Sequence, residues 1–432
     1  MSRKLIAVVA LAFVLALTCA AYAEVQNVKV GGDISVLAFS RHGFNFEQDA
    51  AANTSKTDVA GLAEIANIKI DADLTDAVAT TVILRNERFW GDSIGAEEDA
   101  DLDVYLAAGF VTLKEFMGQP MTLKVGQMGL KLGSGLLVGD PNTNQTSTGK
   151  FNYGLADLCP RKAFTGAVGV FDLAPVTLTA GALKVTDADM TINGDDVNAW
   201  VVNAGFDLKE LGFENGTAEV YDVLREAKRT SSNSSATEVN NIGFRTQVGL
   251  SDTVSVGGEA VYQKQKGIRT DRKSSTDAAV LLNASIAMPD VVFAPSIGLD
   301  FTRLSQNWNT MFEDMTPADI ANVIFPNTNV QCLGATVGLK PMTDVGLKIR
   351  YANFKAVHGM SGFSSNWANG GSYEMNADKK QLGNELDVHL AYDYTEDVQF
   401  GLKGGYFVPG QAFDRNNRKA ASQVIGSMKV TF

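Results

Sequence analysis

Charged side chains occur at alternate positions of several segments whose intervening positions are apolar. Lys348-Ile349-Arg350 and Leu386-Asp387-Val388 both show this alternation. Alternate side chains of an extended strand point to opposite faces, so the pattern puts the charges on one face. Opposite charges that face each other across water set up a transverse field, which sorts solutes by charge and hydration. If the strands enclose a water-filled lumen, the charged face points into it. The residues predicted to line or constrict this lumen are Arg85, Asp103, Lys124, Lys131, Arg161, Arg245, Glu259, Lys348, Arg350 and Asp387.

Four of these residues are arginines that are predicted near the long-loop ends of their strands: Arg85, Arg161, Arg245 and Arg350. One hypothesis is that they form a basic rim, which would attract anionic solutes. The alternative is that they only solvate the lumen and form salt bridges with neighbouring carboxylates. The sequence leaves both interpretations open.

The elements that would position these charges are β-strands. Apolar and polar residues alternate over about ten positions in most of the chain, most clearly in 386–394, 398–408 and 423–432. The apolar faces end in aromatic residues, as in the interfacial girdle of a membrane barrel. These aromatic residues are Tyr392, Tyr394, Tyr406 and Phe432. A soluble β-sandwich is the alternative, but its apolar faces would have to meet each other and its strands would be shorter.

Short and long connections alternate along the chain, which is the layout of outer-membrane barrels. Short turns fall at positions such as Thr75-Asp76, Ser251-Asp252 and Glu396-Asp397. The long polar connections are 41–58, 89–98, 131–160, 187–196, 227–238, 267–275, 305–328, 358–379 and 409–417. The count predicts an all-β, antiparallel up-and-down transmembrane barrel of about 18 strands. A barrel of about 16 strands is the alternative if the weakly patterned segments 59–73 and 215–226 are not strands.

Residues 1–23 have the form of a secretory signal peptide. Arg3 and Lys4 precede an apolar run, and Ala21-Tyr22-Ala23 supplies small residues for cleavage. A membrane anchor is disfavoured because the run is short, and lipidation of Cys19 is disfavoured because Thr18 precedes it. The predicted domains are therefore a signal peptide and, over 24–432, a barrel in the outer membrane of a Gram-negative-type bacterium.

The charge of the chain limits its partners. The net charge is −12, and removal of Arg3 and Lys4 with the signal peptide takes it to −14. Such an acidic protein would repel nucleic acid phosphates, so a nucleic acid partner is not expected. The expected partners are outer-membrane lipid, lipopolysaccharide and small polar solutes.

A barrel of this size is too wide for its own side chains to fill, so it leaves an aqueous channel. The predicted function is passive diffusion of small polar or anionic solutes. Loop 131–160 is the third long loop and the longest, and by analogy with porins we expect it to fold inward and constrict the channel. The alternatives are a loop that covers the outer mouth, and a structural, adhesive or complex-forming barrel whose lumen is plugged.

The segment 124–139 reads KVGQMGLKLGSGLLVG, and 161–167 reads RKAFTGA. This arrangement of a strand, a glycine-bearing loop that ends in Leu-Val-Gly, and a return through an arginine resembles the alginate-export-type porin family. The resemblance implies an 18-strand monomeric barrel for anionic polysaccharide or organic solutes. The family form has Arg before the glutamine, whereas Gly126 precedes Gln127 here. The composition alone suits both a monomer and a homotrimer.

Catalysis is not expected. The sequence has no Gly-x-Ser-x-Gly nucleophile elbow and no histidine pair of a metalloprotease. His42 and His358 fall in predicted loops, while His389 shares a lumen face with Asp387 and Asp393. A carboxylate can orient a histidine as a base, but no nucleophile can be named beside it.

Two weaker hypotheses concern loop residues. Asp187, Asp189 and Asp195 supply oxygen ligands at spacings that suggest calcium, but the glycine of the segment is displaced from the position that a calcium turn needs. No other cofactor is expected. Cys159 and Cys332 are predicted to form a disulfide in the oxidising compartment, joining the third long loop to the barrel wall.

Overall fold

The structure is a computed structural model, and it is composed almost entirely of β-strands. The described residues are 26–46, 58–90, 104–141, 158, 160–186, 197–213, 215–227, 236–267, 274–364, 372–415 and 418–432. The strands are β1 (Gln26–His42), β2 (Val59–Thr75), β3 (Val78–Phe89), β4 (Tyr105–Leu113), β5 (Met121–Met128), β6 (Phe164–Leu173), β7 (Val176–Thr186), β8 (Val197–Asp207), β9 (Thr217–Ala227), β10 (Thr237–Gly249), β11 (Val254–Lys266), β12 (Ser275–Ala287), β13 (Ser296–Leu304), β14 (Val330–Met342), β15 (Val345–Ala356), β16 (Gly362–Ser364), β17 (Ser372–Glu374), β18 (Gln381–Asp393), β19 (Val398–Pro409) and β20 (Ala421–Thr431). The helical turns are η2 (Phe116–Gly118), η4 (Lys209–Leu211) and α2 (Ala321–Ile324).

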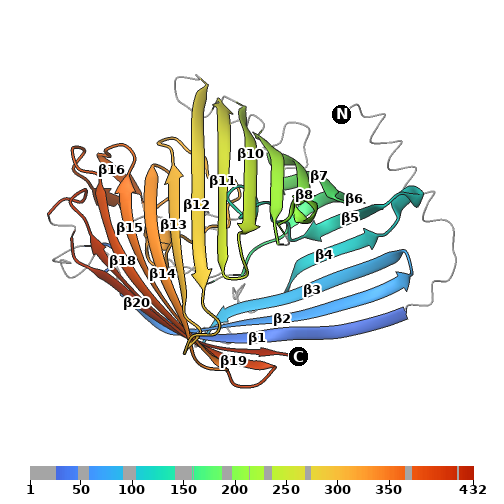
Figure 1. Cartoon of the computed structure of the whole chain (residues 1–432), viewed down its shortest axis with the longest axis horizontal. Coiled ribbons are helices and arrows are strands. Elements are labelled where there is room, and N and C mark those ends of the chain that lie inside the picture. The colour runs from blue at the N-terminus through green and yellow to red at the C-terminus, as the bar shows by residue number, and fades with distance from the viewer. Residues whose placement is uncertain are drawn as a thin grey trace, which may run out of the picture.

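Eighteen of these strands form one closed antiparallel sheet (Figure 1). Each strand pairs with the next one in the chain, and β20 pairs with β1, which closes the barrel. Closure leaves no strand edge unpaired, as a barrel in lipid requires. The predicted count of 18 is confirmed. The alternative of 16 was wrong because β2 includes 59–73 and β9 includes all of 215–226 except its first two residues.

The two faces of the wall differ as the alternation predicts. Leu282, Leu299 and Leu333 point outward and are 53%, 56% and 56% exposed. Glu259 and Asp387 point inward and are 4% and 1% exposed. The outward apolar band is therefore the lipid-facing surface.

Aromatic residues lie at the short-turn end of the outer face. Tyr392, Tyr394 and Phe400 pack against one another there, with ring centroids between 6.1 and 6.4 Å apart. This cluster matches part of the predicted interfacial girdle. Among the described residues, no helix is long and apolar enough to cross a membrane.

The buried apolar core lies inside the barrel, towards the long loops. Phe46 stacks on Phe407 at 5.4 Å and meets Phe413 edge-on at 4.9 Å. Phe325, from the connection between β13 and β14, packs against Phe407 at 5.5 Å. This core joins the wall to inward-folded connections, so it differs from the core of a sandwich, which lies between two sheets.

We predict that a lysine is far more costly on the outer face than on the inner face of the same strand. Leu282→Lys, on the lipid side of β12, should lower the free energy of unfolding by about 2–4 kcal/mol. Asn283→Lys, at the next position and on the lumen side, should have an effect of less than about 1 kcal/mol, because the ammonium group stays in water. Urea unfolding in lipid vesicles measures both. Equal losses in the two variants would contradict the assignment of the faces.

Candidate channel constriction

Residues 131–141, the first part of the third long loop, lie inside the barrel. Its Ser134 N–H donates to Glu259 Oε2 at 3.1 Å. Glu259 lies on the inner face of β11, which is separated from β5 by β6 to β10 in the sheet. Gly133 has a φ of +58°, and a Cβ there would lie 2.7 Å from Glu259 Oε1, so only glycine suits this approach.

A second connection also lies inside the barrel. We call residues 305–329, between β13 and β14, the inner belt. At its start, Gln265 donates to the Asn307 carbonyl at 2.5 Å and Gln263 donates to the Asn309 carbonyl at 2.9 Å. Both glutamines lie on the inner face of β11.

The inner belt then meets the third loop. The Phe312 N–H donates to the Leu137 carbonyl at 3.0 Å, and the Gly139 N–H donates to the Phe312 carbonyl at 2.8 Å. The Phe312 ring packs edge-on against Phe164 of β6, with centroids 5.6 Å apart. Leu137 and Val138 are buried at 1% and 0% exposure. The two inward segments therefore form one packed unit.

Asp314 joins the same two segments through charge. Its carboxylate accepts from Arg161 Nε at 2.5 Å and from Lys131 Nζ at 3.2 Å. Its backbone N–H donates to the Gly135 carbonyl at 2.7 Å. Asp314 is 10% exposed, while Arg161 and Lys131 are 62% and 47% exposed. One belt carboxylate thus balances two cations that the sequence predicted at the constriction.

Beyond Phe312 the inner belt reaches the opposite wall. Glu385 of β18 accepts from the Ile320 N–H at 2.5 Å and from the Ala321 N–H at 2.8 Å. Arg350 of β15 donates to the Pro317 carbonyl at 3.0 Å. The belt therefore contacts the inner wall at β11, at β15 and at β18.

Lys162 follows Arg161 and is held on the inner wall. Its Nζ lies 3.0 Å from Glu87 Oε1 and 2.7 Å from the Tyr105 hydroxyl. Glu87 is fully buried, and Lys162 is 20% exposed. Burial opposes the charged ammonium group, but the Tyr105 hydrogen bond and the Glu87 charge together raise the pKa of Lys162.

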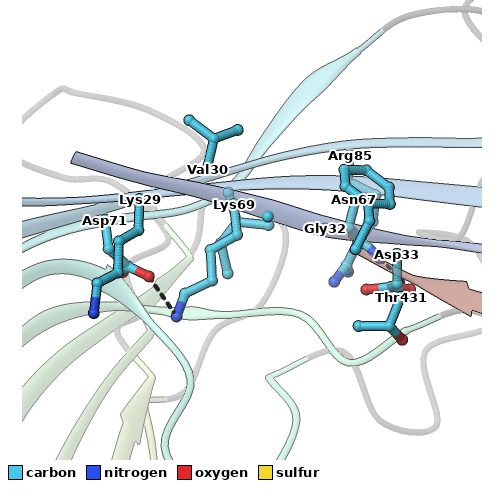
Figure 2. Close-up of a pocket in the computed structure, with 12 residues that line it drawn as sticks. Lys29, Val30, Gly32, Asp33, Asn67, Lys69, Asp71, Arg85 and Thr431 are labelled. Carbon is cyan, nitrogen blue, oxygen red and sulfur yellow. Dashed lines mark hydrogen bonds and ion pairs between the residues drawn. The ribbon is translucent and has the colours of Figure 1, made fainter. Parts of the chain in front are cut away.

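Arg85 connects the third-loop region to a hollow in the wall. Its Nη1 donates to the Arg161 carbonyl at 3.2 Å and its Nε donates to Asn67 Oδ1 at 2.6 Å. The hollow has a volume of about 440 Å³ and is lined by β1, β2, β3 and the end of the chain (Figure 2). Its charged lining residues are Lys29, Asp33, Lys69, Asp71 and Arg85.

Most predicted lumen cations have a carboxylate partner. Arg350 forms a bidentate ion pair with Asp300, in which Nη1 lies 2.5 Å from Oδ1 and Nη2 lies 2.8 Å from Oδ2. Arg245 lies 2.7 Å from Glu219 and 4.0 Å from Glu259. This pairing matches the alternative interpretation, in which salt bridges solvate the lumen.

Three other predicted positions need comment. Arg245 was expected near a long loop, but β10 runs from Thr237 to Gly249, so this arginine lies nearer the periplasmic end and that placement was wrong. Lys124 lies 5.8 Å from the centre of the Phe110 ring. Lys348 shares the inner face of β15 with Arg350 and is exposed.

Several predictions fall outside the described residues. They concern the signal peptide 1–23 and Asp103, Cys159, Asp187, Asp189 and Asp195. Cys332 is buried at 1% exposure on the inner side of β14, and its bridge to Cys159 stays a prediction because Cys159 lies outside the described residues. Within the described ranges, no three metal-ligating side chains form a group that could hold a metal ion.

The inner belt is the feature that sequence reasoning missed. Residues 305–328 were grouped with the polar loops, although they contain Trp308, Phe312 and Ile320, which are 3%, 3% and 0% exposed. Large apolar residues inside a long connection were the available signal, because a loop in water would not bury them.

We predict that Lys162→Met lowers the free energy of unfolding by about 3 kcal/mol, because it removes the nearest cation from the buried Glu87 carboxylate and leaves Arg85, at 3.8 Å, as its cationic partner. Lys131→Met is the matched control and should cost less than about 1 kcal/mol, because Lys131 is half exposed. The Lys162 pKa is raised above its ordinary value of 10.5, so its charge stabilises the barrel fully below that value and ceases to do so as the pH rises through the raised pKa. Urea unfolding at neutral and alkaline pH tests both points, and equal losses in the two variants would refute them.

Solved structures share the fold. OccK9 (OpdG) of Pseudomonas aeruginosa has a TM-score of 0.60 at 11% identity, with 94% of this chain and 99% of that chain covered. OccAB1 of Acinetobacter baumannii has a TM-score of 0.59 at 11% identity, with 95% and 99% covered. OpdK of Pseudomonas aeruginosa, solved with vanillate, has a TM-score of 0.53 at 12% identity, with 94% and 99% covered. At these identities the likeness concerns the fold.

No curated protein sequence matches the chain. A family model does: the model described as alginate export matches residues 35–427, a range that begins within β1 and ends within β20. The resemblance of segments 124–139 and 161–167 pointed to the same family. Because the match covers nearly the whole barrel, the protein belongs to the alginate export family.

Proposed function

We propose that the protein is an outer-membrane channel through which small polar or anionic solutes diffuse passively. The observation that carries the proposal is the pair of inward segments, 131–141 and 305–329, which meet at Asp314 inside a closed barrel of 18 strands. Without these segments, a barrel of this size would be a wide aqueous pore with little selectivity among solutes. Charged side chains surround the narrowed passage, and such groups sort solutes by charge.

The route that we propose passes Arg161 and Lys131 and continues past Arg85 to the hollow on β1 to β3. Arg161 and Lys131 are well exposed although both contact Asp314. Lys29, Lys69 and Arg85 line the hollow together with Asp33 and Asp71, so its cations outnumber its carboxylates by one. These cations on one side of the passage favour an anionic solute. OpdK was solved with vanillate, and a small organic anion of that kind is the solute class that we propose here.

The proposal assigns no catalytic role and no cofactor to the chain. His389, the histidine considered for base chemistry, is in contact with Asp319 of the inner belt at 2.6 Å and thus holds a structural segment. Lipopolysaccharide at the outer rim and a monomeric state are further parts of the proposal. A homotrimer is the alternative.

A plugged structural barrel is the second candidate function. The observation that favours it is the apolar core inside the barrel, in which Phe325 and Ile324 are 4% and 0% exposed. That core is built from the inner belt and the long loops, so it fills part of the lumen. A plugged barrel would fold normally and would not conduct.

Single-channel recording of the refolded protein in a planar bilayer tests the proposal. Steady openings are expected, and under a salt gradient the reversal potential should have the sign of anion preference. A barrel that shows the usual heat-modifiable migration in gels yet never conducts would favour the plugged barrel. Openings with cation preference would refute the anionic solute class.

We predict that Asp314→Asn increases anion preference, because it removes the one carboxylate that contacts both Arg161 and Lys131. The reversal potential should shift further towards the anion limit, and chloride conductance should rise about two- to threefold at low salt. Asp252→Asn removes the same charge from a periplasmic turn and serves as the control. If both variants shift the potential equally, Asp314 does not set the selectivity.

A further inference from the structure

The inner belt is held to the wall on two sides by different chemistry. On the β11 side most of its contacts are amides: Gln263 and Gln265 donate to belt carbonyls, and the Asn309 N–H donates back to Gln263 at 2.7 Å. The Asp277 carboxylate of the neighbouring β12 also accepts from the Asn307 N–H at 3.1 Å. Gln263 also donates to Asn241 at 2.7 Å, which extends this network along the inner wall. Amides do not change charge with pH, so the contacts of Gln263 and Gln265 hold equally at any physiological pH.

On the other side the contacts use ionisable groups. Asp319 Oδ2 lies 2.6 Å from His389 Nε2. The adjacent N–H groups of Ile320 and Ala321 donate to the Glu385 carboxylate, and Arg350 donates to the Pro317 carbonyl. Residues 317–321 are thus held by β15 and β18 through three charged or chargeable side chains.

Charged groups of both signs surround His389. Lys348 and Lys403 are its cross-strand neighbours on β15 and β19, and Asp387 is its inward neighbour on β18. Four carboxylates surround the contact, and three fixed cations oppose them. The carboxylates are Asp300, Asp319, Glu385 and Asp387, and the cations are Lys348, Arg350 and Lys403. Protonation of His389 therefore turns its contact with Asp319 from a neutral hydrogen bond into an ion pair among these charges.

Two of these carboxylates, Asp387 and Asp319, bear directly on the contact. Asp387 is 1% exposed, and the neighbouring groups that act on its carboxylate are Glu385 and the backbone of Asp319. A buried carboxylate without a compensating charge is costly. Burial opposes the charge of Asp319 as well, but the hydrogen bond from His389, and the charges of His389, Lys403 and Lys348, lower the pKa of Asp319. Asp319 therefore stays ionised at neutral and mildly acidic pH.

We propose that the contact between His389 and Asp319 is a proton-operated latch, which holds residues 317–321 more tightly against β15 and β18 when His389 is protonated and loosens them when it is neutral. Histidine changes its charge between about pH 5 and 8. The amide contacts on β11 keep the rest of the belt in place, so a change at His389 moves only residues 317–321. The channel is narrower in acid and wider above neutral pH.

Amide hydrogen exchange of the belt tests the latch without reference to conduction. Exchange is followed by mass spectrometry at about pH 5.5 and about pH 8 and is corrected for the intrinsic pH dependence of exchange. The peptide that contains Ile320 and Ala321 should lose about tenfold in protection at the higher pH, because a charge-assisted contact becomes a neutral one. A peptide around Asn309 should not change.

Variants separate the latch from other effects of pH. His389→Asn should abolish the difference between the two pH values, and His389→Lys should keep the segment protected at both. The chain has three histidines, so His42→Asn and His358→Asn are matched controls that should behave as the wild type does. Asp319→Asn removes the belt side of the contact and replaces His389→Asn if that variant does not fold. An unchanged pH response in His389→Asn or Asp319→Asn, or no response in the wild type, would overturn the proposal.

Conductance then links the latch to the proposed function. This readout rests on the proposed channel function, whereas the hydrogen-exchange readout does not. Wild-type current should rise about two- to threefold from about pH 5.5 to about pH 8, and His389→Asn should remove the change. If exchange shows the latch and no current is seen at either pH, the channel function fails and the latch stands. If current flows and exchange shows no pH response, the latch fails and the channel stands.

Discussion

The structure depends on one constraint: inside a lipid bilayer, every backbone N–H and C=O group must be bonded within the protein. A sheet meets this condition only when it closes on itself, and here β20 returns to β1 to do so. Closure then fixes two faces for every strand, one towards lipid and one towards water. The alternation of apolar and charged residues, from Lys348-Ile349-Arg350 to Leu386-Asp387-Val388, follows from that division.

A closed barrel of 18 strands leaves an interior that its own wall cannot fill. The chain fills part of this space with two connections, and it holds them there by both packing and charge. Phe312 packs between the third loop and β6, whereas Asp314 and Glu385 accept hydrogen bonds from groups on opposite sides of the lumen. Leaving such polar groups unpaired inside the barrel would be costly, so each inward segment needs specific partners on the wall.

The strands and connections could be predicted from sequence because their signals are local. The period of two identified β14 and placed Cys332 on its inner side, and turn residues located the short connections. The inner belt could not be predicted, because its partners lie far away in the sequence: Ile320 and Glu385 are 65 residues apart. Arg245 was placed too near the long loops for a related reason, since parity gives the face of a strand residue and does not give its depth.

The pairing of β1 with β20 has a consequence for how the protein is assembled. Asp33 pairs with Thr431 in this register, so the contact that seals the wall joins segments separated by nearly the whole described chain. Loop-closure entropy makes such a contact slow to form. Until it forms, both strands present unpaired edges that attract other chains. During delivery to the membrane, β1 and β20 must therefore be kept from pairing with other proteins while the intervening hairpins form. The time between export and barrel closure then influences how much of the protein folds correctly.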